Sequence, residues 1–200
     1  MKTVVLATNN AHKVSEISTA LAFPGWEFKT LREMGVDSDP AEDADTFLGN
    51  ARIKAVAARE ACGGLATLAD DSGLEVDALD GAPGVWSSRF AGEDATDADN
   101  NAKLLADLAN VPDDQRTARF VCTLVFIDED GTEQVARGTV EGRIGYAEQG
   151  DGGFGYDPLF WPDVFDGACT LAEVPQARKN EVSHRGNALR QLRSQLEARL

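Results

Sequence analysis

Two adjacent carboxylates, Asp70 and Asp71, follow a short apolar run and are the residues of this sequence best suited to metal chemistry. The run Leu65–Ala69, preceded by Gly63 and Gly64, is typical of a covered strand. Two carboxylates near low dielectric need a cation, a shared proton or open water to hold them apart. Mg²⁺ meets this need, because it takes carboxylate oxygens, waters and substrate phosphates rather than a full protein cage. We therefore expect a magnesium site where this strand ends.

A solvated turn is the alternative interpretation of the same stretch. Ser72 and Gly73, which follow the two aspartates, are common turn residues. The aspartate pair alone therefore leaves both interpretations open.

Positively charged side chains occupy the opening turns of two expected helices. Lys13 lies at the start of the first helix, and His184 and Arg185 lie at the start of the last, where a cation opposes the helix dipole by about 0.3–1 kcal/mol. An anionic ligand would reverse that sign, because a phosphate chain across both helix starts would bind free N–H groups and the charges of Lys13, Arg185 and Lys179. Cations that simply extend into water are the alternative, and for His184 a packed or capping role is.

A glycine-rich stretch, Gly150–Pro158, precedes the last helix and contains too much glycine for regular structure. Its glycines would let the backbone approach a flat ligand, and Phe154, Tyr156 and Trp161 would offer stacking faces. The same aromatic residues would also suit an ordinary core.

Apolar periodicity predicts strands that alternate with helices in the first half of the chain and a long hairpin in the second. The expected strands span 4–7, 26–31, 65–69, 74–78, 119–127 and 132–144, and the expected helices begin near Asn9 or Asn10, Thr46, Thr96 and Ser183. An acidic loop, Asp37–Asp45, leads into the second helix. This order predicts a mixed α/β fold with a central sheet flanked by helices, a smaller lobe that bears the hairpin, and a ligand cleft between the lobes. We expect residues 1–200 to form a single domain of two lobes without a separable linker.

The balance of charge argues against nucleic acid and membrane partners. With 34 acidic and 19 basic residues among 200, the formal net charge is −15, which repels polyanions at long range. A small anionic ligand stays possible, since local cations dominate within a Debye length of roughly 8 Å. Cys62, Cys122 and Cys169 show neither disulfide nor zinc spacing. The apolar run Val4–Ala7 is too short for a signal peptide, and no later stretch is typical of a membrane span, so we expect a cytoplasmic protein.

Five motifs in order make the sequence resemble a known enzyme family. They are TNNAHK, EDADTFLGNARIKA, ADDSGLEVDALDGAPGVWSSRF, GGFGYDPLF and KNEVSHRGNAL. Together they resemble the noncanonical purine nucleoside triphosphate pyrophosphatases, the inosine triphosphate pyrophosphatase family, over nearly the whole chain. The resemblance implies a two-lobed α/β fold with a nucleotide cleft, a homodimer, and Mg²⁺-dependent hydrolysis of ITP, dITP and XTP to the monophosphate and pyrophosphate.

The resemblance also implies a role for individual residues. Glu42 and Asp71 would bind the metal, and Asp71 would accept the proton of the attacking water. Asp70 would shape the same corner of the site. The nucleotide would be bound by residues of all five motifs, namely Thr8, Asn9, Asn10, Ala11, His12, Lys13, Lys54, Ser72, Phe154, Gly155, Tyr156, Asp157, Lys179, His184 and Arg185. Within this set, Phe154–Asp157 would hold the base.

One position departs from the family pattern. Gly49 stands where the family usually has Glu, in the interior of the second helix, where glycine costs about 1 kcal/mol relative to alanine. Because glycine has no side chain, we do not expect position 49 to take over a metal or structural role of that glutamate.

The resemblance leads to two hypotheses about selectivity and mechanism. A pocket that hydrogen-bonds the 6-oxo group of hypoxanthine or xanthine would leave a buried donor unpaired against adenine, at about 1–3 kcal/mol, so ATP would be a poor substrate. Metal and basic groups would neutralise the phosphates while a carboxylate orients water. A nucleotide-binding regulatory protein that does not hydrolyse its ligand, and a pyrophosphatase of the same fold for other modified nucleotides, are the alternatives.

Overall fold

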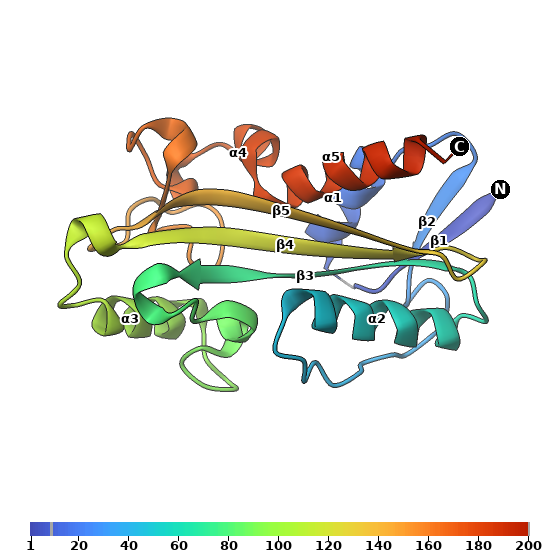
Figure 1. Ribbon diagram of the computed structural model, residues 1–200, viewed down its shortest axis with the longest axis horizontal. Helices are drawn as coiled ribbons and strands as arrows, with labels where there is room; N and C mark the ends of the chain where they lie inside the picture. The colour runs from blue at the N-terminus through green and yellow to red at the C-terminus, as the bar shows by residue number, and fades with distance from the viewer. Residues whose placement is uncertain (9, 200) are drawn as a thin grey trace. The chain divides into compact units, whose positions relative to one another are not determined.

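The computed structural model describes residues 1–8 and 10–199 and is an α/β structure built on one open sheet (Figure 1). In these residues six strands pair in the order β2-β1-β3-β4-β5-β6. The strands are β1 (Lys2–Leu6), β2 (Trp26–Thr30), β3 (Ala66–Val76), β4 (Thr117–Ile127), β5 (Glu133–Ile144) and β6 (Phe160–Pro162). The helices are α1 (Ala11–Ala20), α2 (Phe47–Ala61), α3 (Asp97–Asp107), α4 (Gln176–Val182) and α5 (His184–Glu197). The predicted mixed α/β fold with a central sheet flanked by helices is confirmed.

The chain divides into two compact units. The first unit comprises residues 1–71, 122–138 and 185–200, and the second comprises residues 72–121 and 139–184. We expected the hairpin of β4 and β5 to belong to the smaller lobe. This was wrong, because the turn of the hairpin lies in the first unit and its open end lies in the second. That the two units form a single domain stays a prediction.

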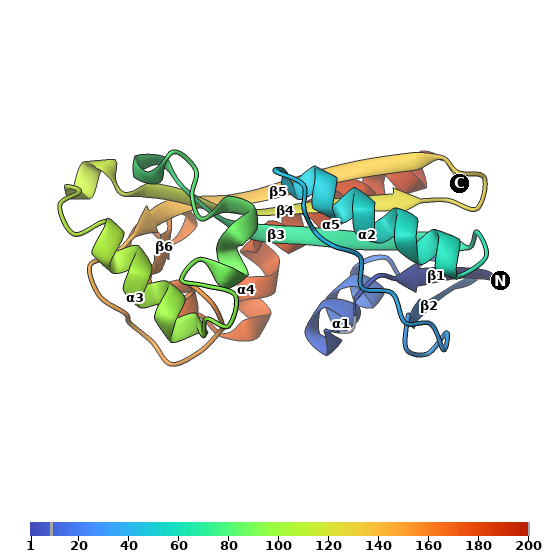
Figure 2. The same cartoon turned by 90° about the horizontal axis from the view of Figure 1, so that it is seen from below.

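In the first unit, helices cover both faces of the sheet (Figures 1 and 2). Side chains of β1 alternate in direction, so Val4 and Leu6 pack with Ile17 of α1 and Leu192 of α5, whereas Val5 packs with Ala58 of α2. β1 pairs in parallel with both β2 and β3. β1 and β2 therefore end side by side, at the pair Leu6 and Thr30, whereas β3 continues beyond its last pair with β1 at Leu68.

In the second unit, α3 packs on the end of β3, the beginning of β4 and the end of β5. Leu104 and Leu108 share one core with Leu74, Ile144 and Phe160. α3 begins with a capping box, as predicted, in which Thr96 and Asp99 bond each other's backbone N–H groups. The start of α3 is therefore fixed in place, which matters for the loop it holds.

The sequence prediction was wrong about the break after residue 69. We expected one strand to end before Asp70 and Asp71 and another to begin at Leu74, but β3 is continuous from Ala66 to Val76. β4, an 11-residue strand, is the neighbour of β3 in the sheet, and its backbone keeps β3 extended through the aspartates. Two short elements, α4 and β6, were not predicted.

The remaining features follow the sequence closely. Cys62, Cys122 and Cys169 are free thiols, and of the three only Cys122 is fully buried. Among residues 1–8 and 10–199, none of the helices combines the length and the hydropathy that a membrane crossing requires.

Candidate active site

β3 presents Asp70 and Asp71 where its neighbour β1 has already ended. The last β1 residue, Leu6, pairs with Leu68, and Ala7 N–H still donates to the Leu68 carbonyl at 2.9 Å. Beyond this point β3 has no β1 partner. Since successive side chains of a strand point to opposite faces, Asp70 and Asp71 reach different surroundings.

Asp70 points to the face that α1 and α5 cover. Its carboxylate contacts Lys13 Nζ at 2.8 Å and Arg185 Nε at 3.5 Å, and Arg185 also donates to Glu16 at 2.8 Å. Asp70 is 3% exposed. Burial alone would raise the pKa of Asp70, but Lys13 and then Arg185 outweigh it and hold that pKa far below its usual range. The two helix starts that the sequence singled out therefore meet at one carboxylate.

Asp71 points to the face that α2 covers. Lys54 Nζ lies 3.4 Å from Asp71 Oδ1 and 2.7 Å from Glu42 Oε2, so one ammonium group holds two carboxylates together. Burial raises the pKa of Asp71; Lys54 opposes this shift and Glu42 adds to it. Asn50 is close enough to lower the same pKa slightly, yet no described residue makes a hydrogen bond of ordinary geometry to the buried Asp71 Oδ2.

The loop before α2 places Glu42. Thr46 is the N-cap of α2 and accepts a hydrogen bond from Gly49 N–H, and Ala44 N–H donates to Asn50 Oδ1 at 3.0 Å. A Cβ atom on Gly49 would lie 2.5 Å from Ala44 Cβ. The glycine that departs from the family pattern therefore leaves room for this loop to lie against α2.

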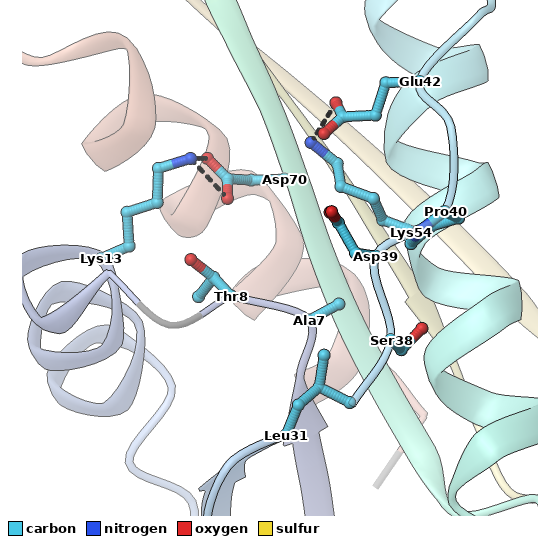
Figure 3. Close-up of a pocket in the computed structure, with 10 residues that line it drawn as sticks. All are labelled: Ala7, Thr8, Lys13, Leu31, Ser38, Asp39, Pro40, Glu42, Lys54 and Asp70. Atoms are coloured by element: carbon cyan, nitrogen blue, oxygen red, sulfur yellow. Dashed lines mark hydrogen bonds and ion pairs between the residues drawn. The ribbon is translucent and has the colours of Figure 1, made fainter. Parts of the chain in front are cut away.

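Lys13, Asp70, Glu42 and Lys54 line a polar pocket of about 250 Å³ inside the first unit, and Asp71 lies beside it on β3 (Figure 3). Figure 3 shows Asp70 pointing from β3 towards Lys13, with Glu42 and Lys54 on the other side of the strand. Five of the lining residues were predicted, namely Thr8, Lys13, Glu42, Lys54 and Asp70, and five were not, namely Ala7, Leu31, Ser38, Asp39 and Pro40. The acidic composition of residues 37–45 was the signal that could have indicated Ser38 to Pro40.

The loop before α1 also contributes to this region. Asn10 caps α1, because its Oδ1 accepts a hydrogen bond from Lys13 N–H at 3.3 Å, and Thr8 Oγ1 accepts one from Asn10 N–H. Ala11 is the first residue of α1. Asn9 and the side chain of His12 lie outside the described residues.

A second group of predicted site residues lies in the second unit. Asp157 Oδ2 accepts a hydrogen bond from Phe154 N–H at 2.9 Å and forms a buried ion pair with Lys179. Lys179 Nζ also lies 4.7 Å from the centroid of the Phe154 ring, which is 61% exposed. Tyr156 donates its hydroxyl hydrogen to the Ser87 carbonyl at 2.8 Å. The charge of Lys179 is therefore already paired within the protein.

His184 and Ser72 complete the set. The imidazole of His184 stacks on Phe120 with 5.1 Å between ring centroids and an interplanar angle of 16°. Ser72 follows Asp71 within β3 and is half-buried. Nothing in the local sequence relates Phe120 to His184, so the sequence does not predict this contact.

The donor set around Glu42 and Asp71 fits a hard divalent cation. Within residues 1–8 and 10–199, no three His, Cys, Asp or Glu side chains gather closely enough to hold a metal alone. Two carboxylates with one oxygen lacking a donor do suit Mg²⁺, which completes its shell with water and substrate phosphate.

The fold and this site together define an α/β protein with a carboxylate–lysine site in a polar pocket. The model of the Ham1 family matches residues 4–195, and the chain belongs to this family.

The sequence and the fold are similar to those of other proteins over nearly the whole length of each chain. A dITP/XTP pyrophosphatase of Photobacterium profundum is 51% identical over 195 residues and one of Exiguobacterium sibiricum is 48% identical over 193, with 96% of each chain covered in both cases. The solved structure of a HAM1 protein from Coxiella burnetii has a TM-score of 0.91 at 40% identity and covers 99% of this chain and 100% of its own.

Proposed function

We propose that this protein hydrolyses the noncanonical purine nucleoside triphosphates ITP, dITP and XTP to the monophosphate and pyrophosphate. Relatives at about half identity carry the name dITP/XTP pyrophosphatase, which supports the reaction class. The observation that carries the proposal is the pocket itself, in which Lys13 and Lys54 accompany Asp70 and Glu42 at the open edge of β3. A triphosphate needs such cations, and a hydrolase needs a carboxylate beside them.

Glu42 and Asp71 are the residues that would hold Mg²⁺. When bound, the ion would supply positive charge to the phosphate oxygens. Lys54 bridges the two carboxylates in the structure and would turn to the phosphate chain in the complex. Thr8, Lys13 and the N–H groups at the start of α1 would bind the same chain.

Asp71 would accept the proton from the water that attacks the α-phosphorus, releasing pyrophosphate. Its burial supports this role, because a carboxylate with a raised pKa is a stronger base than one in water. Asp70 would not compete for the proton, since two cations favour its ionised form. The unequal surroundings of the two aspartates thus favour one proton acceptor.

The base would be bound by the loop Phe154–Asp157, with Ser72, Lys179, His184 and Arg185 completing the nucleotide contacts. The Phe154 ring supports this assignment, because it is 61% exposed and an exposed aromatic ring can stack on a base. We also propose that the enzyme works as a homodimer in the cytoplasm, as its resemblance to the pyrophosphatases implies.

A panel of nucleoside triphosphates tests the proposal. With Mg²⁺, the protein should release pyrophosphate and monophosphate from dITP and XTP, and its kcat/KM for ATP should be lower by about tenfold or more, the effect of one unpaired buried donor. Tight binding without release would instead identify a regulatory nucleotide-binding protein. Two inorganic phosphates in place of pyrophosphate would show that another bond is cleaved.

A further inference from the structure

Two side chains of α3 hydrogen-bond both the N–H and the carbonyl group of one glycine, Gly155, in the loop Phe154–Asp157, here called the aromatic loop. Gly155 N–H donates to Asp97 Oδ2 at 2.7 Å, and the Gly155 carbonyl accepts from Asn101 Nδ2 at 3.2 Å. Asp97 and Asn101 are four residues apart, so they lie on the same face of α3. All three residues belong to the second unit.

The held glycine is the centre of the loop proposed to bind the base. Gly155 has a φ of +59°, and Gly153 has a φ of +76° and lies so close to Asp157 that a Cβ atom there would be 2.2 Å from Oδ2. Asp157 holds one part of the loop, because it accepts a hydrogen bond from Phe154 N–H and pairs with Lys179. The two contacts from α3 hold a different residue, Gly155, which lies between Phe154 and Tyr156.

Asn101 buries a polar oxygen without a hydrogen bond, which costs free energy that a side chain with only a packing role would not cost. It is 3% exposed, and its Oδ1 atom is buried without a hydrogen-bond partner among the described residues. An apolar side chain of similar size would fill the space without an unpaired oxygen. The amide is useful at this position for its N–H donor, which reaches Gly155.

We propose that Asp97 and Asn101 are positioning residues that set the affinity for the nucleoside part of the substrate by fixing Gly155. This inference rests on the proposed function, since it assigns a purpose to the loop Phe154–Asp157. The two residues touch no substrate themselves; they hold the backbone between the exposed Phe154 ring and Tyr156, whose hydroxyl is tied to Ser87.

The test compares substrate binding with and without a base. Asp97→Ala and Asn101→Leu should each raise the KM for dITP by about tenfold, with kcat changed by less than about threefold, because a lost charge-assisted or buried hydrogen bond has this effect. Inhibition by inorganic tripolyphosphate, which has no base, should stay at the wild-type value. Asp97→Asn keeps an acceptor oxygen and should restore most of the affinity, which separates the hydrogen bond from the charge at the helix start.

Leu105→Ala is the matched control, because it removes packing from α3 without touching Gly155. It should lower the melting temperature and leave the KM for dITP unchanged. Equal weakening of dITP and tripolyphosphate in the Asp97 and Asn101 variants would overturn the inference, as would a wild-type KM.

Amide hydrogen exchange of the segment 153–157 gives a readout that does not need activity. Exchange should be faster in Asp97→Ala and Asn101→Leu than in the wild type, and unchanged protection would contradict the proposed contacts. A wild-type protein that releases pyrophosphate from no nucleotide would overturn the proposed function, whereas a wild-type enzyme with unaffected variants would overturn only this inference.

Discussion

The carboxylate site of the first unit and the aromatic loop of the second unit are built in different ways. Asp70 and Asp71 sit on a regular strand, and each is held by cations from helices that pack on its own face of the sheet. Gly155 and its neighbours have no regular structure and are held by single hydrogen bonds from α3 and by the Asp157–Lys179 pair.

The first region controls the ionisation of carboxylates, and the second controls the position of aromatic rings. Ion pairs lower the pKa of Asp70, whereas burial raises the pKa of Asp71 in spite of its ion pair with Lys54, and this contrast suits proton transfer and metal binding. Hydrogen bonds to a glycine backbone set the position of flat aromatic faces, which suits recognition of a base. Changes in the first region should therefore alter stability and turnover, and changes in the second should alter KM.

The largest expected effect is on stability, from Asp70→Asn. The change leaves Lys13 and the buried Arg185 without their shared carboxylate, and removing one partner of a buried ion pair costs about 3–5 kcal/mol. The melting temperature should fall by on the order of 10 °C at pH 7. Thermal unfolding followed by circular dichroism measures it.

The pH dependence gives this prediction a second arm. Because the folded-state pKa of Asp70 is lowered, its contribution to stability is fully present above the unfolded pKa of about 3.9 and is lost as the pH falls towards the folded value. The difference between wild type and Asp70→Asn should therefore shrink below about pH 4. Asp45→Asn, on an exposed position, is the control; a difference that stays constant down to pH 3 would contradict the ion-pair explanation.

Asp71→Asn should reduce turnover more than it reduces stability. It removes the proposed proton acceptor with little change in volume, so kcat for dITP should fall by about a hundredfold or more. The KM should change less than kcat, because Asp71 would act on the substrate only through Mg²⁺ and the attacking water and the base is bound elsewhere. Steady-state pyrophosphate release measures both constants.

Asp43→Asn is the matched control for this change, since Asp43 is an exposed carboxylate next to Glu42 in the same loop. It should keep wild-type kcat. If Asp71→Asn also kept it, Asp71 would not be the proton acceptor and the site would need another base.

The regular parts of the site could be predicted from the sequence because they depend on local rules. Capping residues placed the start of α3, and the charges in the first turns of α1 and α5 indicated that Lys13 and Arg185 lie close together, although the sequence predicted a phosphate chain as the anion between them. That anion is Asp70 in the structure. Local sequence could not show this, because the contact joins Asp70 to residues 57 positions before it and 115 positions after it.

The continuous course of β3 and the contacts of the loops could not be predicted, because they depend on residues far apart in the sequence. Ser72 and Gly73 have turn propensity, but β3 stays extended through them beside its long neighbour β4. The grip of Asp97 and Asn101 on Gly155 spans more than 50 positions and leaves no periodic pattern. Long-range contacts of this kind become visible only when the fold is known.

The smallest expected effect comes from Gly49→Ala and reports how tightly the Glu42 loop lies against α2. Gly49 lies in the first turn of α2, so alanine there should stabilise the helix by less than the about 1 kcal/mol that it gains over glycine in a helix interior. The new Cβ atom, however, would lie 2.5 Å from Ala44 Cβ, so the loop that carries Glu42 must shift, which should disturb the contact between Glu42 and Lys54. We expect a melting temperature within about 3 °C of wild type and a kcat lower by roughly threefold, with a higher Mg²⁺ concentration needed for half-maximal rate.

Val56→Ala, a change on an exposed position of the same helix, is the control and should leave the Mg²⁺ requirement unchanged. A Gly49→Ala variant with wild-type Mg²⁺ dependence would mean that the loop adapts freely and that Gly49 has no part in placing Glu42.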